Sequence, residues 1–190
     1  MTKIYFEDIS NLTQADYTLG YSLLCNALRD KIDTKKREDK KRQSLLGYML
    51  FYRAAQELYG KTDFDVSVSK DGKPSVDFCN FSISHSENMV CCAVSDRPIG
   101  VDIQKIYSVE KRGKYCFFNQ QETHYVNQDG REITQKFFEI FTKKEAALKL
   151  LGGKISDMKN IDTFDKKYTF KTEKKGEYML SICSFFDIDI

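Results

Sequence analysis

The sequence has little of what marks disordered, membrane-spanning or secreted chains. Only two of its 190 residues are proline, whereas 41% are hydrophobic and 13% aromatic, so we expect a globular protein. No run approaches the ~20 apolar residues that span a bilayer, and the longest, around 45–52, is interrupted by glycine. The first residues, MTKIYFEDISN, carry acids where a signal peptide has its apolar stretch. We therefore expect a soluble, cytoplasmic protein that does not contact a membrane.

Charge and cysteine content argue against two further classes. The formal net charge of +2 is too small to indicate a nucleic-acid partner. The six cysteines include no Cys-x-x-Cys pair, and we interpret them as small buried hydrophobic residues in a reducing compartment, not as zinc ligands or disulfides. Cys91 and Cys92 are adjacent, so a strand would turn them to opposite faces.

The first part of the chain combines one long helix with short strands. A basic stretch from Lys35 leads into an apolar helix that ends at Gly60. Extended runs follow at 64–70, 81–86 and 89–95, with a turn at Asp71-Gly72 after the first of them.

The second part repeats this plan. A strand at 98–106 precedes a short helix near 110–127 and a long helix over 131–151. Two strands, at 167–172 and 177–186, complete it. A long helix with antiparallel strands in each part predicts an α+β fold.

The repeated plan also predicts where the domains divide. We place the boundary at Asp96-Arg97-Pro98, which gives an N-terminal half of residues 1–97 and a C-terminal half of residues 98–190. A ligand cleft is expected between the halves, where such sites commonly form.

One acid interrupts the apolar face of the second long helix. At about 100° per residue, Glu145 falls among Phe, Ile and Leu side chains, and Lys149 lies one turn further on. A buried carboxylate costs free energy unless something pairs with it. A salt bridge to Lys149, in the favoured Glu-to-Lys spacing, is one explanation. A bound cation is another.

A second acid lies on the strand at 98–106. Strict alternation places Asp102 and Gln104 on one face, about 7 Å apart along the backbone. They could simply face water. A divalent cation would instead compensate both Asp102 and Glu145, because Mg²⁺ takes one or two carboxylates, waters and phosphate oxygens.

Six short motifs resemble those of the 4′-phosphopantetheinyl transferases, and they occur in that family's order between about residues 35 and 155. They are KKRQSLLG (40–47), GKP (72–74), SISHS (82–86), GVDIQ (100–104), FFNQQE (117–122) and FTKKEAALK (141–149). The chain resembles the larger, monomeric, pseudo-dimeric Sfp-like class of this family rather than the small trimeric holo-acyl-carrier-protein synthases.

The resemblance implies a fold and a reaction. The fold would have two pseudo-symmetric halves, each with a long helix packed on a small antiparallel sheet, and the active site in the cleft between them. In the reaction, a serine hydroxyl of an apo acyl or peptidyl carrier protein attacks the β-phosphate of coenzyme A, and adenosine 3′,5′-bisphosphate leaves. Mg²⁺ is the implied cofactor, with Mn²⁺ as an alternative, and the enzyme is expected to be a monomer.

Two other functions remain open from the residues. A relative that binds coenzyme A or its carrier without turnover would keep the fold. A nucleic-acid binder would rest on the basic stretch alone, which lacks the aromatic interleaving typical of such proteins.

The resemblance also assigns roles at the reacting centre. Asp102, Gln104 and Glu145 are the implied metal ligands, and Asp102, Glu145 and Lys149 the implied catalytic residues. Lys149 would neutralise the pyrophosphate. Gln104 departs from the family's usual glutamate and brings no charge. Glu122 matches a family acid near the site, although a solvated helix residue is the other interpretation.

Coenzyme A would be bound by residues of the earlier motifs. The implied set, apart from Lys149, is Arg42, Ser44, Lys73, Pro74, Ser84 and His85. Taken alone, His85 could be structural and Lys73 an exposed turn lysine. The stretch 35–42 has six basic and two acidic residues, and it is either a solvated helix start or a phosphate site at a helix N-terminus.

Overall fold

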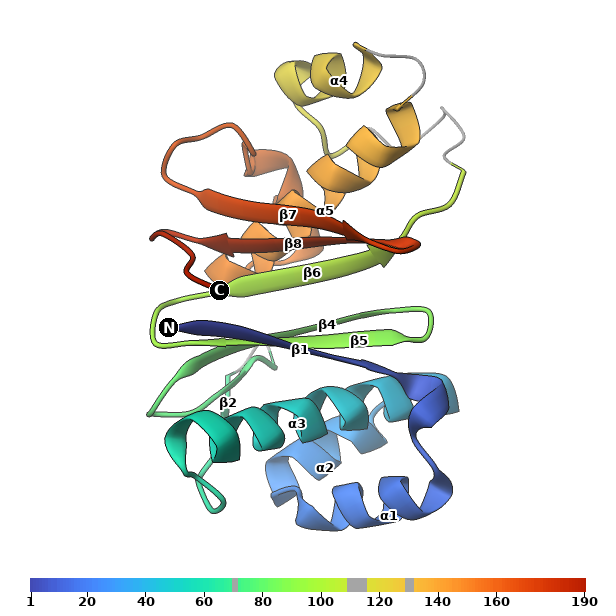
Figure 1. Cartoon of the computed structure of the whole chain (residues 1–190), viewed down its shortest axis with the longest axis vertical. Helices are drawn as coiled ribbons and strands as arrows, with labels where there is room; N and C mark the ends of the chain where they lie inside the picture. Colours follow the sequence, from blue (N-terminus) through green and yellow to red (C-terminus); the bar gives the residue numbers. More distant parts are fainter. Residues whose placement is uncertain (70–71, 109–115, 129–131) are drawn as a thin grey trace.

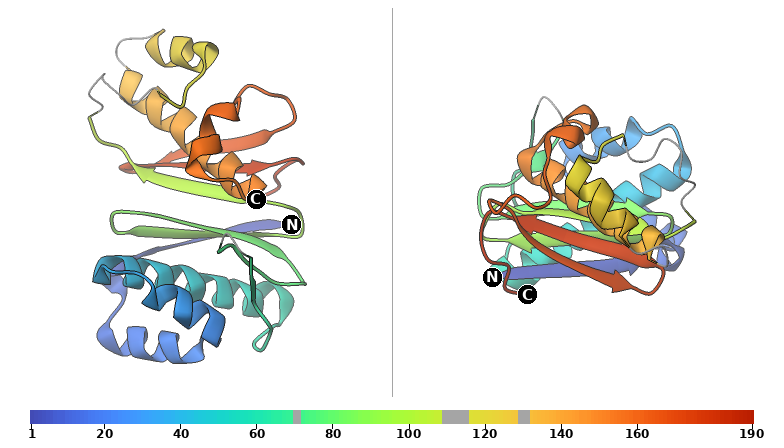
Figure 2. Two further views of the ribbon diagram at one scale, coloured as in Figure 1. Left: turned by 180° about the vertical axis from the view of Figure 1, so that it is seen from behind. Right: turned by 90° about the horizontal axis from the view of Figure 1, so that it is seen from above.

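Two three-stranded antiparallel sheets form the centre of the molecule. The computed structural model describes residues 1–69, 72–108, 116–128 and 132–190. The first sheet has the order β1-β5-β4 and the second β6-β8-β7. Figure 1 shows the sheets stacked, with the N-terminal helices below the first and α5 beside the second. Seen from behind, α5 covers the outer face of the second sheet (Figure 2).

The first sheet and its helices come from the N-terminal part of the chain. Their bounds are β1 (Thr2–Asp8), α1 (Gln14–Leu23), α2 (Asn26–Asp33), α3 (Glu38–Tyr59), β4 (Asn80–Ser86) and β5 (Met89–Ser95), with a 3₁₀ turn at Ile9–Asn11. The strand predicted at 64–70 is wrong in extent. Only β2 (Ser67–Val68) pairs there, with β3 (Pro74–Ser75).

The second sheet and its helices come from the C-terminal part. Their bounds are β6 (Gly100–Lys105), α4 (Gln120–Asn127), α5 (Ile133–Leu151), a 3₁₀ helix at Ile155–Asn160, β7 (Thr169–Lys175) and β8 (Tyr178–Ser184). The α+β class, both long helices and the strands of this part are as predicted. Residues 110–115 of the predicted short helix lie outside the described residues, and within the described part the helix begins at Gln120.

Apolar layers between the helices and the sheets hold these elements together. Leu50, Phe51 and their neighbours on α3 pack against one face of the first sheet. Val101 and Ile103 of β6 pack against the other face, between the sheets. A third layer, which includes buried Cys183, lies between α5 and the second sheet.

The cysteines follow the predicted strand alternation. Cys92 lies in the layer under α3 and Cys91 in the layer between the sheets. Both are fully buried free thiols, as is Cys183, whereas Cys116 is exposed.

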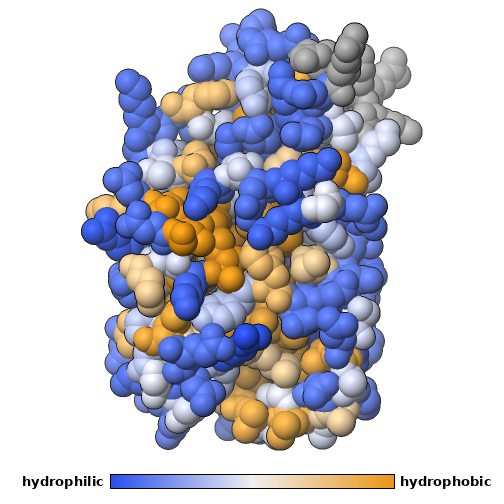
Figure 3. Space-filling view, in the orientation of Figure 1, coloured by the Kyte–Doolittle hydropathy of each residue, from blue (hydrophilic) through white to orange (hydrophobic). Residues whose placement is uncertain are grey.

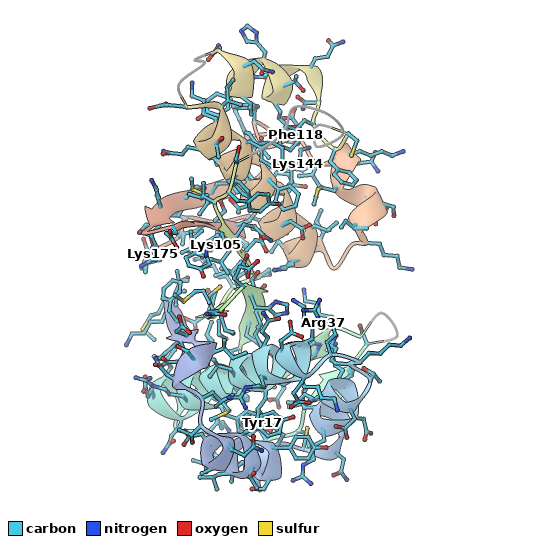
Figure 4. The ribbon with its side chains drawn as sticks, turned by 90° about the vertical axis from the view of Figure 1, so that its right-hand side faces the viewer. Tyr17, Arg37, Lys105, Phe118, Lys144 and Lys175 are labelled. Atoms are coloured by element: carbon cyan, nitrogen blue, oxygen red, sulfur yellow. The ribbon has the colours of Figure 1, made fainter. Side chains whose placement is uncertain are left out.

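A fully buried ion pair ties α4 to α5. The Lys144 ammonium lies 2.8 Å from the Glu122 carboxylate, and both side chains have 0% exposure. Lys144 also donates to the backbone carbonyls of Met158 and Ile161. Glu122 accepts from the amide and the hydroxyl of Thr163, both at 3.0 Å. Figure 4 labels Lys144 in the upper part of the molecule, among the side chains of these helices.

This pair corrects the interpretation of Glu122 as a solvated helix residue. The carboxylate is enclosed by Lys144, Thr163 and its own helix N-terminus. Its role is to compensate a buried ammonium, since neither charge would be tolerated alone.

The face of the molecule drawn in Figure 3 is mostly hydrophilic. Figure 3 shows an apolar patch at mid-height, on the side where Figure 1 places the two chain ends. A groove there is lined by Met1, Ile4, Ile188 and Ile190, among others. Within the described ranges, no helix has the length and apolar character that crossing a bilayer requires.

We predict that Lys144→Met lowers the free energy of unfolding by about 3–5 kcal/mol, because it leaves the Glu122 carboxylate buried without a counter-charge. Urea denaturation measures this loss. The double variant Glu122→Gln/Lys144→Met removes both charges and should recover much of the loss. A single variant that loses less than about 1 kcal/mol would contradict this description of the pair.

Candidate active site

Strand β6 lies against helix α5 with no room for a side chain at Gly100. A Cβ atom added there would lie 2.0 Å from the carbonyl oxygen of Ala146 and 2.7 Å from the amide nitrogen of Leu150. Any other residue would push the strand away from the helix. The close approach brings Asp102, two residues along β6, to the part of α5 that carries Glu145 and Lys149.

The Asp102 carboxylate is buried and fully engaged. Its side chain is 2% exposed, and Lys149 Nζ lies 2.8 Å from Oδ1. Ser84 Oγ donates to the same oxygen at 2.7 Å, and Gln104 Nε2 donates to Oδ2 at 3.1 Å. The ammonium of Lys149 therefore compensates the buried charge of Asp102.

Glu145 lies beside this group but lacks a comparable partner. Within the described part of the chain, no donor is hydrogen-bonded to its carboxylate, and the ion pair with Lys149 proposed from the helix pattern is not formed. The pKa of Glu145 is raised to about 7, mainly by burial and also by the charge of Asp102, whereas the charge of Lys149 opposes the rise. Two carboxylates thus lie near the Lys149 ammonium, which pairs with Asp102 and leaves Glu145 without an ion-pair partner among the described residues.

Lys149 also lines a cavity of about 380 Å³, which we call the lysine cavity, whereas Asp102 and Glu145 are not among its lining residues. None of the described lining residues is acidic. Five of them are lysines: Lys31, Lys35, Lys73, Lys149 and Lys154. Burial lowers the pKa of Lys73, and its ammonium donates to the Lys149 carbonyl at 2.9 Å. Such a concentration of positive charge suits a ligand with several phosphates.

Four of the residues predicted to bind coenzyme A line the lysine cavity besides Lys149. They are Ser44, Lys73, Pro74 and His85. His85 Nδ1 is buried and has no hydrogen-bond partner among the described residues. Burial lowers the pKa of His85 to about 4, and the charges of Lys40 and Lys149 act in the same direction, so the ring is neutral at pH 7.

Two other predicted residues do not reach the cavity. Arg42 donates to the backbone carbonyl of Leu12, and its guanidinium lies 5.8 Å from the centre of the Tyr17 ring. Ser84 is buried and does not line the cavity, and its hydroxyl donates to the Asp102 carboxylate. In the basic stretch, Arg37 pairs with Asp39 at 2.7 Å on the lower part of the molecule (Figure 4).

The sequence interpretation missed Lys31 and Lys154. Lys31 lies on α2 and donates to the carbonyl of Gly72, and burial lowers its pKa. Lys154 follows the glycine pair that ends α5. Neither belongs to one of the six motifs, and a single lysine carries no signal of its own because most lysines are exposed.

Comparison with known proteins identifies the family of the chain. Residues 98–185 match the family model of the 4′-phosphopantetheinyl transferase superfamily. The 4′-phosphopantetheinyl transferase gsp of Aneurinibacillus migulanus is 30% identical, over 76% of this chain and 69% of its own length. The chain belongs to the 4′-phosphopantetheinyl transferase superfamily.

Further members are similar to the chain at comparable levels. The 4′-phosphopantetheinyl transferase Sfp of Bacillus subtilis (strain 168) is 28% identical over 76% of this chain and 67% of its own length. The 4′-phosphopantetheinyl transferase HetI of Nostoc is 36% identical over a shorter stretch, 43% of this chain and 36% of its own length. The Sfp-like resemblance and the transferase fold are thus confirmed.

The donors at the site fit the divalent cation that this superfamily implies. Within the described residues, no group of three or more Cys, His, Asp or Glu side chains could hold a metal. Two carboxylates are nevertheless present, and Glu145 has the uncompensated charge that a cation would neutralise. Mg²⁺ needs no more than one or two carboxylates from a protein.

The side-chain amide of Gln104 could contribute an oxygen ligand only if that oxygen were turned toward Asp102. Its amide nitrogen faces Asp102, and its oxygen accepts from Ser86 Oγ at 3.3 Å. The amide must turn over before its oxygen could join Asp102 as a ligand, so its predicted role as a third ligand stays a prediction.

We predict that Glu145→Gln stabilises the metal-free protein at pH 8 by about 2 kcal/mol and has little effect near pH 4.5. The folded-state pKa of about 7 lies above the ordinary 4.5, so ionisation of Glu145 opposes folding. This cost is absent below the ordinary pKa and complete above the folded-state pKa. Urea denaturation with a chelator present measures it at both pH values.

Glu139→Gln is the matched control on the same helix. The Glu139 carboxylate is paired with Lys143 and accepts from the Tyr125 hydroxyl at 2.8 Å. Its replacement should therefore lower stability or leave it unchanged. A Glu145→Gln protein no more stable than wild type at pH 8 would contradict the uncompensated charge at Glu145.

Proposed function

We propose that this chain transfers the phosphopantetheine arm of coenzyme A to a serine hydroxyl of an apo acyl or peptidyl carrier protein. The serine oxygen forms a bond to the β-phosphorus, and the bond from that phosphorus to the bridging oxygen breaks. The bridging oxygen leaves on adenosine 3′,5′-bisphosphate. Similarity to curated 4′-phosphopantetheinyl transferases supports this reaction.

One observation carries the proposal: Asp102 and Glu145 lie together beside Lys149, which lines the lysine cavity. Asp102 and Lys149 are in contact at 2.8 Å, and Asp102 is close enough to raise the pKa of Glu145. The cavity offers five ammonium groups, which suit the pyrophosphate and the 3′-phosphate of coenzyme A. Phosphoryl transfer depends mainly on such positioning and charge neutralisation.

Each site residue then has a distinct role. Asp102 and Glu145 would hold Mg²⁺, or Mn²⁺ in its place, with Gln104 as a third donor. When bound, the cation neutralises charge on the phosphates. Lys149 neutralises the pyrophosphate, and Glu145 accepts the serine proton directly or through a water molecule. His85, Ser44, Lys73 and Pro74 would contact the nucleotide part of coenzyme A.

The proposal includes the division into halves 1–97 and 98–190, with the site between them. The cavity is lined by Lys31, Lys73 and His85 from the first and by Lys149 and Lys154 from the second, which supports this division. We propose that the enzyme acts as a monomer. Its free cysteines suit the reducing cytoplasm, where we expect it to work.

We predict that the protein, given coenzyme A and Mg²⁺, adds one phosphopantetheine to an apo carrier protein. Mass spectrometry of the carrier measures the gain. Asp102→Ala and Glu145→Ala should each reduce the rate at least ~100-fold, because each removes a carboxylate from the cation. Near-UV circular dichroism establishes that the variants are folded.

Glu177→Ala is the control for these variants, since it removes an exposed acid that does not line the lysine cavity. Full activity of either site variant would refute the assignment. A carrier that stays unmodified across several carrier types, with coenzyme A still bound, would favour a non-catalytic relative.

We predict that Gln104→Glu stays active and needs less Mg²⁺. The added carboxylate contributes roughly 1 kcal/mol of charge–charge attraction, which lowers the half-saturating Mg²⁺ concentration about fivefold. Rates measured across a Mg²⁺ series, and again with Mn²⁺, report the shift. Loss of all activity in a folded variant would place Gln104 elsewhere than beside the cation.

A further inference from the structure

The two sheets meet along their edge strands through side chains. Strand β4 is the edge of the first sheet and β6 the edge of the second. Backbone amides of β6 donate to serine hydroxyls of β4 in three successive rungs, which we call the serine ladder: Val101 to Ser82 at 3.1 Å, Ile103 to Ser84 at 3.3 Å, and Lys105 to Ser86 at 2.9 Å.

The spacing of the SISHS motif produces this ladder. Serines at alternate positions of β4 face one side, where they meet the alternate amides of β6 that point away from β8. Ile83 lies between them and packs on the α3 side. An edge strand with unpaired amides is costly when buried, and a hydroxyl can accept from such an amide. It then keeps its own proton for a second partner.

In the middle rung, the serine hydroxyl donates its proton to a carboxylate of the site. Ser84 Oγ accepts from the Ile103 amide and donates to Asp102 Oδ1 at 2.7 Å. Ser84 is buried, with 4% exposure, so its hydroxyl cannot turn to water instead. Among the described residues, Ser82 makes the ladder bond but donates to no carboxylate.

We propose that the serine ladder fixes the Asp102 carboxylate relative to β4, and that Ser84 is a positioning residue for cation binding. This inference rests on the proposed metal site. Ser84 and Lys149 together hold Oδ1 from two different elements, β4 and α5. Loss of the hydroxyl frees the carboxylate to rotate, and loss of such an outer partner typically weakens metal binding 10- to 100-fold.

The experiment measures Mn²⁺ affinity alone, from the free-ion signal in electron paramagnetic resonance, without coenzyme A. We expect Ser84→Ala to weaken Mn²⁺ binding about tenfold or more. Ser82→Ala removes a ladder bond of the same kind and should stay within about twofold of wild type. Urea denaturation of both variants establishes whether they lose similar stability. Equal Mn²⁺ affinity of the two variants overturns the inference.

Two further variants separate the possible failures. Asp102→Asn should abolish Mn²⁺ binding, and if it does not, the proposed metal site is wrong. If Asp102→Asn abolishes binding but Ser84→Ala does not weaken it, only the role of Ser84 is wrong. Should Ser84→Ala not fold, Ser84→Cys keeps a small side chain with a weak donor. Its affinity should then lie below that of wild type, and an unchanged affinity would overturn the inference.

Discussion

The contact between β6 and α5 at Gly100 is the constraint on which the site depends. Ala146 O occupies the space of a side chain at this position, so the strand and the helix touch through their backbones. The side chains of Asp102 on β6 and Lys149 on α5 then come within 2.8 Å of each other. Without this approach, the two site acids would face different surroundings, and neither would perturb the other.

The packing leaves the two acids of the site with unequal partners. Asp102 has an ammonium and two neutral donors, whereas Glu145 is left with a raised pKa. At the preceding position of α5 the opposite case occurs, because the Lys144 ammonium and the Glu122 carboxylate are completely buried and paired. Adjacent residues on α5 therefore have different surroundings: Lys144 is paired with a buried carboxylate, whereas Glu145 has no hydrogen-bond donor among the described residues.

Periodicity predicted the elements that bury a clear apolar face. Helix α5 and strand β6 are examples, because their apolar residues recur with regular spacing. The N-terminal elements β1 and α1 were not predicted. Helix α1 buries only Gly20, and β1 is mostly half-buried, so neither carries a periodic apolar pattern.

The site was predictable where a residue conflicts with its local pattern. Glu145 was such a residue, and in the structure its carboxylate is largely buried and has a raised pKa. Partners distant in sequence left no comparable signal. Arg42 binds the Leu12 carbonyl, and Ser84 holds Asp102, although the motifs suggested coenzyme A for both. Lys31 reaches the cavity only because α2 packs on α3.

The most direct test is the position of a Mn²⁺ ion in crystals grown or soaked with it, located by anomalous scattering. Our description predicts a single strong peak between the carboxylates of Asp102 and Glu145, at the edge of the lysine cavity. A peak held by other residues, with these two carboxylates unchanged, would contradict it.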